Sequence, residues 1–219
     1  MAVDRTKYMG KDEVKTLRTV TEARAIMDLQ RGRVNGVLAW MVVDTALSTG
    51  LRVSEIVALK VEDVDLKMGA VKVVRLKKKK KVVETVPVGK EFVQHLKEYL
   101  QWRADRLGEM DKAYRKGLTD KSGVLLVGQR GPLTNRGAQQ IWKTAIKRAG
   151  LREDLSIHSA RHTLATTLLR KTKNLRQVQK MLGHSSPTVT ANMYADVTFE
   201  DMQDGLNGLY DDDNTDKGQ

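Results

Sequence analysis

A segment that is apolar on nearly every side constrains the fold most strongly. Residues 37–48 read VLAWMVVDTALS, and Asp44 is the one charged residue among them. A helix that is apolar all round is normally buried in a protein core, so we expect this segment to be the central helix of a domain that ends at Gly50. The most apolar run, 37–47, is too short to cross a bilayer, which takes about 20 residues.

Apolar residues at helical intervals predict five further helices, over residues 11–30, 91–107, 135–150, 159–172 and 175–182. We expect Thr134 to cap the third of these helices and His95, in the second, to be a surface residue. Two apolar faces are predicted: Val14, Leu17, Val20, Ile26 and Leu29 in the first helix, and Ile141, Trp142, Ala145 and Ile146 in the third.

Between residues 69 and 88 the apolar period changes to two, with β-branched residues on both sides of a lysine run, Lys77 to Lys81. This pattern predicts a β-hairpin with a charged turn, and a further short strand is expected at 123–127. The predicted fold class is therefore α+β, mainly α-helical, with a small antiparallel sheet or hairpin.

The chain of 219 residues carries a formal charge of +12, and its pI is about 9.8. Such a surface favours a polyanion, although a merely solvated lysine-rich surface would look the same. Residues 200–219 hold seven acidic residues and one Lys. We therefore expect one domain over 1–199, followed over 200–219 by a short helix and a disordered acidic tail.

The absence of Cys excludes disulfides and thiolate metal sites. His158 and His162 are spaced i, i+4, but the H-E-x-x-H zinc motif needs Glu where Ser159 stands. We expect no metal and no cofactor. The N-terminus lacks an apolar signal region, so we expect a cytoplasmic protein without a membrane partner.

The stretch from His158 to Tyr194 concentrates polar residues, and it holds three of the four histidines. His158 and Arg161 are related by i, i+3, so they should share one face of a helix and point out of it. The opposite, core-facing stripe would be Leu164, Ala165, Leu168 and Leu169.

Turn signals place the other polar residues of this stretch. Gly183 should end the 175–182 helix, and His184 follows it directly. Ser186 and Pro187 then read as the start of a short helix that carries Tyr194. Upstream, Arg52 lies in the turn before a helix for which Ser54 is the expected N-cap.

These motifs, taken in order, resemble the C-terminal signature of the tyrosine recombinase (phage integrase) family. The resemblance comprises H-x-x-R-H at 158–162, L-G-H at 182–184, a Tyr ten residues later, and TGLRVSEIVALKVEDVDL at 49–66, where Arg52 and Glu55 stand in the expected places. It covers nearly all of the family's catalytic domain, and it implies that domain's fold.

The resemblance implies a site-specific DNA recombinase that cuts and rejoins DNA through a 3′-phosphotyrosyl intermediate at Tyr194, for integration, excision or inversion. Arg52 and Arg161 would clamp the non-bridging phosphate oxygens through their planar guanidinium forks. His158 and His184 would move protons or donate hydrogen bonds to the phosphate. Glu55 would support the basic cluster, and His162 would pack behind it.

The family places a general-acid lysine on the hairpin. Counting from the first strand favours Lys77, whereas counting back from Pro87 favours Lys79. Residues two apart in a strand point the same way, so both remain candidates.

The same resemblance implies double-stranded DNA with short inverted-repeat sites as partner, a synaptic tetramer on that DNA, and accessory DNA-binding proteins. Only about fifty residues precede the Arg52 motif, so we expect the catalytic domain, either of a short single-domain inversion-type recombinase or of an element integrase without its arm- and core-binding parts. Two alternatives stay open: a type IB topoisomerase-like enzyme, and a DNA-binding recombination accessory protein that does not cut.

Overall fold

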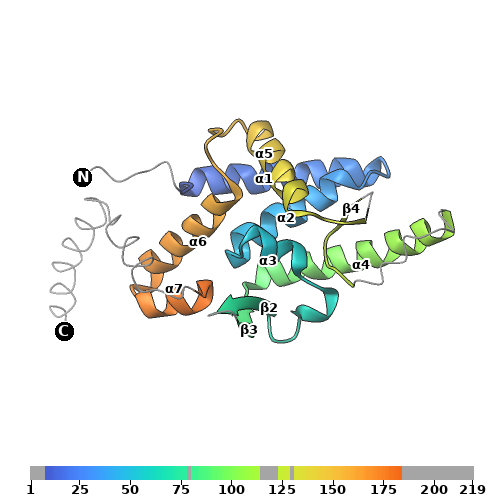
Figure 1. Cartoon of the computed structure of the whole chain (residues 1–219). Coiled ribbons are helices and arrows are strands. Elements are labelled where there is room, and N and C mark those ends of the chain that lie inside the picture. Colours follow the sequence, from blue (N-terminus) through green and yellow to red (C-terminus); the bar gives the residue numbers. More distant parts are fainter. Residues whose placement is uncertain (1–7, 78–79, 114–122, 129–130, 184–219) are drawn as a thin grey trace, which may run out of the picture.

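The computed structural model describes residues 8–77, 80–113, 123–128 and 131–183 (Figure 1). Its helices are α1 (Lys11–Gln30), α2 (Asn35–Thr49), α3 (Val53–Ala58), α4 (Lys90–Ala113), α5 (Asn135–Arg148), α6 (Ile157–Thr172) and α7 (Leu175–Leu182), with a 3-10 turn at Val61–Asp63. Its strands are β1 (Val64–Asp65), β2 (Ala70–Lys77), β3 (Lys80–Pro87), β4 (Val127–Gly128) and β5 (Gly131–Pro132). This arrangement confirms the predicted fold class.

Helix α2 is the centre of the core, as its composition predicts. Met41, Val42 and Val43 are completely buried, and α1, α4, α5 and α6 all pack against this helix (Figure 1). Gly50 ends α2 in the left-handed conformation, with φ 62°, which glycine adopts without strain. Among the described helices, none has the length and hydropathy needed to span a membrane.

The predicted hairpin is formed by β2 and β3, which pair antiparallel from Ala70↔Pro87 to Lys77↔Lys80, and β1 adds a third strand. Val73 and Val86 are buried on the inner face, whereas Val74 and Val83 are exposed on the outer face. In Figure 1 the hairpin lies beneath α3, with its turn end toward α7.

The predicted apolar face of α1 is wrong at its C-terminal end, where Ile26 and Leu29 are about half exposed. The buried stripe continues instead through Ala25 and Asp28. Asp28 is buried because its carboxylate accepts a hydrogen bond from the backbone N–H of Gly36 at 2.8 Å, which closes the turn between α1 and α2. This polar contact between α1 and α2 takes the buried position that was expected for the apolar side chains of Ile26 and Leu29.

Other boundaries differ from the predictions by a few residues. Helix α3 begins at Val53, so Ser54 is inside the helix rather than its cap. Helix α4 continues past residue 107 to Ala113. In the expected strand at 123–127, Val124 makes one bridge to Lys60, and Val127 begins β4. Helix α5 begins as predicted, with the Thr134 hydroxyl accepting from the Gly137 N–H.

The expectation that His95 is a surface residue is wrong. Its Nδ1 lies 2.7 Å from Oδ2 of Asp44, which is 2 % exposed and also pairs with Arg18 at 3.3 Å. The single charge in the apolar helix is thus paired with Arg18 of α1 and contacted by His95 of α4. This cluster joins three helices.

Candidate active site

Arg52 and Glu55 form a tight local unit at the start of α3. The first N–H groups of a helix have no partner within the helix, and here Oε2 of Glu55 accepts the Arg52 N–H at 2.8 Å. Oε1 of the same carboxylate binds Nη1 of Arg52 at 3.0 Å. Glu55 is buried, whereas the Arg52 side chain is 47 % exposed. The carboxylate therefore fixes a guanidinium that still faces solvent.

Arg161 is buried, with 7 % of the residue exposed, so the prediction that it points outward is wrong. Its Nη1 donates to the Gly50 carbonyl at 2.8 Å, and its Nη2 donates to the Leu182 carbonyl at 2.7 Å. These carbonyls lie at the C-terminal ends of α2 and α7, where helices leave acceptors unpaired and the helix dipole favours a cation. Two helix ends thus draw the guanidinium inward.

The position of Arg161 also follows from the packing around Gly50. A Cβ at Gly50 would lie 2.9 Å from Leu182 Cδ2 and 3.0 Å from Leu164 Cδ2. Glycine therefore lets α2, α6 and α7 come close enough for one guanidinium to reach two backbones. Residues far apart in the sequence meet at this point.

A third arginine, Arg75 of β2, belongs to the same cluster and was not singled out from the sequence. It is 2 % exposed, its Nη1 donates to Oε2 of Glu84 at 2.6 Å, and its Nη2 donates to the Met181 carbonyl at 3.0 Å. Its Nε lies 3.6 Å from Oε1 of Glu55. The available signal was strand parity, because the inward positions of the hairpin include 75 as well as 71 and 73.

Charge is unbalanced in this arginine cluster, which we define as Arg52, Arg75 and Arg161 with Glu55 and Glu84. Burial lowers the pKa of Arg161 to about 10; Arg52 and Arg75 act in the same direction, and Glu55 opposes them. The guanidinium therefore stays charged at neutral pH. Three cations against two carboxylates leave an excess positive charge beside the exposed part of Arg52, as an anion-binding site requires.

The other predicted site residues lie in different surroundings. His158, the second residue of α6, is exposed, unlike Arg161 one turn later, and His162 is half-buried. Lys77 is the last residue of β2, whose backbone pairs there with Lys80. Lys79, His184 and Tyr194 lie outside the described residues, so both lysines remain candidates.

Helix α7 leads directly to His184. It spans Leu175–Leu182, as predicted, and Oδ1 of Asn174 caps its start by accepting the Gln177 N–H at 3.1 Å. It ends at Gly183 with φ 65°. Val178 and Leu182 bury its apolar side against Ala165 and Leu169 of α6. The end of α7 therefore lies next to the arginine cluster, where Arg161 binds the Leu182 carbonyl.

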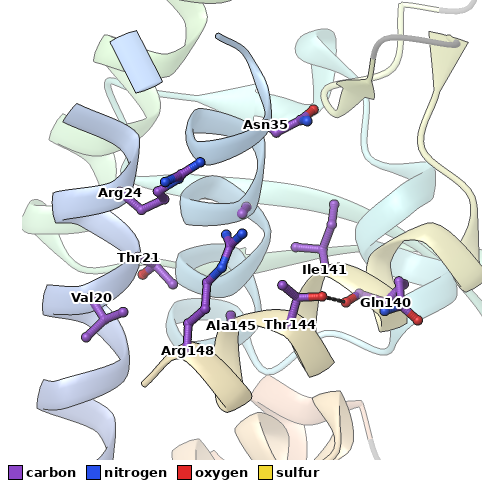
Figure 2. Close-up of a pocket in the computed structure, with 10 residues that line it drawn as sticks. Val20, Thr21, Arg24, Asn35, Gln140, Ile141, Thr144, Ala145 and Arg148 are labelled. Atoms are coloured by element: carbon purple, nitrogen blue, oxygen red, sulfur yellow. Dashed lines mark hydrogen bonds between the residues drawn. The ribbon is translucent and has the colours of Figure 1, made fainter. Parts of the chain in front are cut away.

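A separate hollow of about 240 Å³ lies between α1, α2 and α5. Figure 2 shows Arg24 of α1 and Arg148 of α5 reaching toward the same space, over an apolar wall that includes Ile141. Arg24 is already paired with Asp28 at 3.0 Å. The hollow shares no residue with the arginine cluster. Within the described residues, no three His, Cys, Asp or Glu side chains gather as a metal ion would need.

The sequence profile described as "Phage integrase family" matches residues 7–201, which is most of the chain. The chain belongs to the phage integrase, or tyrosine recombinase, family. It is similar to the tyrosine recombinase XerC of Halalkalibacterium halodurans, with 36% identity over 162 residues, 74% of this chain and 50% of that protein. It is also similar to XerD of Staphylococcus saprophyticus, with 31% identity over 223 residues, 94% of this chain and 70% of that protein.

Solved structures of other proteins share this integrase fold. A crystal structure of XerA recombinase superimposes with a TM-score of 0.69 at 25% identity, over 92% of this chain and 65% of that one. XerH bound to its difH substrate, before cleavage, gives a TM-score of 0.65 at 23% identity, over 86% of this chain and 50% of that one. The chain thus spans about half the length of several proteins that it matches.

Proposed function

We propose that this chain is the catalytic domain of a site-specific DNA recombinase that cuts and rejoins DNA through a 3′-phosphotyrosyl intermediate at Tyr194. One observation carries the proposal: Arg52 and Arg161, from opposite halves of the chain, converge around the buried carboxylate of Glu55 with an excess of positive charge. Family membership adds the chemistry for which such a cluster is suited. The remaining proposed residues are His158, His184 and a hairpin lysine, either Lys77 or Lys79.

The proposed cleavage step needs no water or metal. The phenol oxygen of Tyr194 attacks phosphorus, the bond from phosphorus to the 5′ oxygen breaks, and the phenol proton leaves to a base. The hairpin lysine gives a proton to the departing 5′ oxygen. Arg52 and Arg161 stabilise the charge that builds up on the non-bridging oxygens. Attack by a 5′ hydroxyl of another strand reverses these steps and rejoins the DNA.

The proposed partner is double-stranded DNA with short inverted repeats, and the proposed assembly is a synaptic tetramer, with accessory DNA-binding proteins where the outcome requires them. Relatives of this fold are described as bound to difH or to transposon DNA. The net charge of +12 suits such a partner. The proposed outcome is integration, excision or inversion, carried out in the cytoplasm. Residues 198–210 would pack onto a neighbouring subunit, and residues 200–219 would form the acidic tail beyond the catalytic domain.

The decisive experiment traps the covalent intermediate. The probe is a pool of duplexes with randomised inverted repeats around a nicked spacer, so that cleavage releases a short piece and prevents rejoining. We expect DNA adducts that survive denaturing gels, enrich one repeat sequence over successive rounds, and disappear in Tyr194→Phe. Adducts that persist in Tyr194→Phe, or no adduct despite retained DNA binding, would overturn the proposal.

Plasmid substrates separate the alternatives. With the selected sites on a supercoiled plasmid, a recombinase yields inverted or excised products. A type IB topoisomerase-like enzyme would relax a plasmid that lacks any site, and an accessory protein would bind both plasmids without breaking a strand.

The tetramer needs a test of its own. Deletion of residues 198–219 should abolish paired-site complexes in a mobility-shift assay while single-site binding stays within about threefold, because multivalent contacts and not the DNA contacts are lost. Unchanged pairing would rule out a role for this segment in assembly.

A further inference from the structure

We propose that Arg75 is a positioning residue that holds the leaving-group lysine of the β2–β3 hairpin in place; this inference rests on the recombinase function proposed above. Among the described residues, Arg75 contacts two carboxylates and a backbone carbonyl. It acts through the end of β2, where Lys77 follows it by two residues.

Arg75 joins three elements through one side chain. Its Nη1 binds Glu84 of β3 at 2.6 Å, its Nη2 binds the Met181 carbonyl of α7 at 3.0 Å, and its Nε lies 3.6 Å from Glu55 of α3. Glu55 in turn holds Arg52. A planar guanidinium with donors on three sides can span such a set, and a lysine ammonium cannot. Arg75 therefore links the hairpin to the unit that presents Arg52 through an ion pair with Glu55 rather than a hydrogen bond.

Burial of the described hairpin side chains decreases toward the turn. Val71 and Val73 bury the base of β2, and Arg75 is the next inward residue at 2 % exposure. On β3, residues 80–83 are all exposed, and Val83 is 64 % exposed. Among these residues, Arg75 is the buried side chain nearest to the turn. The burial that would hold the hairpin in place stops there. Without this side chain the two strands would still pair, but their turn end would be free to move relative to α3.

Helix α7, the other partner of Arg75, is held independently. Its apolar residues Val178 and Leu182 are buried against α6, and the Leu182 carbonyl binds Arg161. Loss of Arg75 should therefore displace the hairpin more than α7. This asymmetry indicates that Arg75 acts on the lysine of the hairpin and not on the residues after α7.

Close packing shows that the position of the Arg75 guanidinium is narrowly defined. Gly183 has φ 65°, and a Cβ placed there would lie 1.9 Å from Nη1 and 2.8 Å from Cδ of Arg75. No side chain fits between the two residues. The guanidinium is therefore enclosed by a backbone, two carboxylates and a carbonyl, as a fixed brace requires.

The test uses a substrate whose leaving group needs no acid. In the selected site, the scissile phosphate carries sulfur in place of the 5′ bridging oxygen, because a thiolate departs without being protonated. Single-turnover cleavage is measured on oxygen and sulfur substrates with the wild type, Arg75→Met, Arg75→Lys, Lys77→Ala and Lys79→Ala. Arg152→Met is the matched control, since Arg152 also bridges separate segments, through Tyr8 and Glu13, but lies outside the arginine cluster.

We expect Arg75→Met and Arg75→Lys to slow cleavage of the oxygen substrate about 10- to 100-fold, which is part of the roughly 10²- to 10⁴-fold that a general acid contributes. On the sulfur substrate both variants should return to within about threefold of wild type, as should one of the two lysine variants. Arg152→Met should cleave both substrates like wild type. Circular dichroism checks folding, and Arg75→Lys keeps the test decisive if Arg75→Met fails to fold.

Two results would overturn this inference: an equal defect of the Arg75 variants on both substrates, or rescue of these variants when neither lysine variant is rescued. The first would mean that Arg75 does not act through the acid, and the second that the acid is not on the hairpin. Failure of the wild type to cleave either substrate would instead remove the recombinase proposal itself.

Discussion

Arg161 donates through Nη2 to the carbonyl of Leu182, the last residue of α7, at 2.7 Å, while its Nη1 holds the Gly50 carbonyl. Among the described residues, two backbone carbonyls from different helices therefore hold the guanidinium. Its place depends on the mutual packing of α2, α6 and α7, which makes several changes predictable.

Arg161→Lys should cost both activity and stability. An ammonium keeps the charge but cannot reach two carbonyls and a phosphate with a planar fork. We expect cleavage to fall about a hundredfold or more, as for loss of a transition-state donor. We expect the free energy of unfolding to fall by about 1–3 kcal/mol, because a buried carbonyl loses its partner. Single-turnover kinetics and urea unfolding measure the two effects; Arg152→Lys, as control, should leave cleavage unchanged.

Gly50→Ala should destabilise the protein more than Gly32→Ala. Both glycines have nearly the same conformation, with φ 62° and 63°, so both substitutions carry a left-handed strain of about 1 kcal/mol. Only at Gly50 would the new Cβ collide, with Leu182 and Leu164. Overpacking adds about 1–3 kcal/mol. Equal losses in urea unfolding would show that α7 does not pack on Gly50.

Glu55→Gln should leave the arginine cluster overcharged. Glu55 is 8 % exposed, and removing one partner of a buried ion pair costs about 3–5 kcal/mol; because the amide still accepts one hydrogen bond, we expect about 2–4 kcal/mol. Added phosphate should raise the Tm of Glu55→Gln more than that of wild type, since a bound anion replaces the lost charge. Glu62→Gln, which breaks only the exposed pair with Lys60, should change neither value. An identical phosphate response in wild type and Glu55→Gln would argue against the anion site.

Asp44→Asn tests the cluster that joins α1, α2 and α4. The buried carboxylate faces Arg18 and His95, so we expect the neutral amide to reduce the free energy of unfolding by about 2–4 kcal/mol. Cleavage measured well below the Tm should be unaffected. Glu91→Gln is the matched control, because Glu91 also pairs with Arg18 but is 75 % exposed, and little change is expected. Loss of cleavage in Asp44→Asn at full folding would place this cluster in the active site.

The sequence predicts the helices and the hairpin, because apolar period and turn residues are local properties. It also singles out Arg52, Glu55 and Arg161, which the fold brings into one cluster. It fails on the direction of Arg161. Helical spacing groups Arg161 with His158, but only tertiary packing brings the carbonyls of Gly50 and Leu182 within reach. A buried arginine is unexpected until its acceptors are known.

Arg75 was not singled out from the sequence, for a different reason. Strand parity predicts its inward position, yet a charged residue at such a position reads as an exception to the pattern. Its partners, Glu84 and the Met181 carbonyl, come from a neighbouring strand and from a helix late in the chain. For Lys77 and Lys79 the hairpin itself was predicted correctly, but the observed register, with Lys77 paired to Lys80, does not choose between them.

The tight fit between Gly183 and Arg75 has a practical consequence for engineered chimeras. Because no side chain can stand between these two residues, the end of α7 and the part of β2 around Arg75 form one interlocking piece, although the two residues are 108 positions apart in the sequence. A graft that exchanges α7 and the segment after it for those of another integrase must carry a compatible β2 strand as well. Designs that swap contiguous blocks of sequence would break this fit, whereas designs that swap both segments together would retain it.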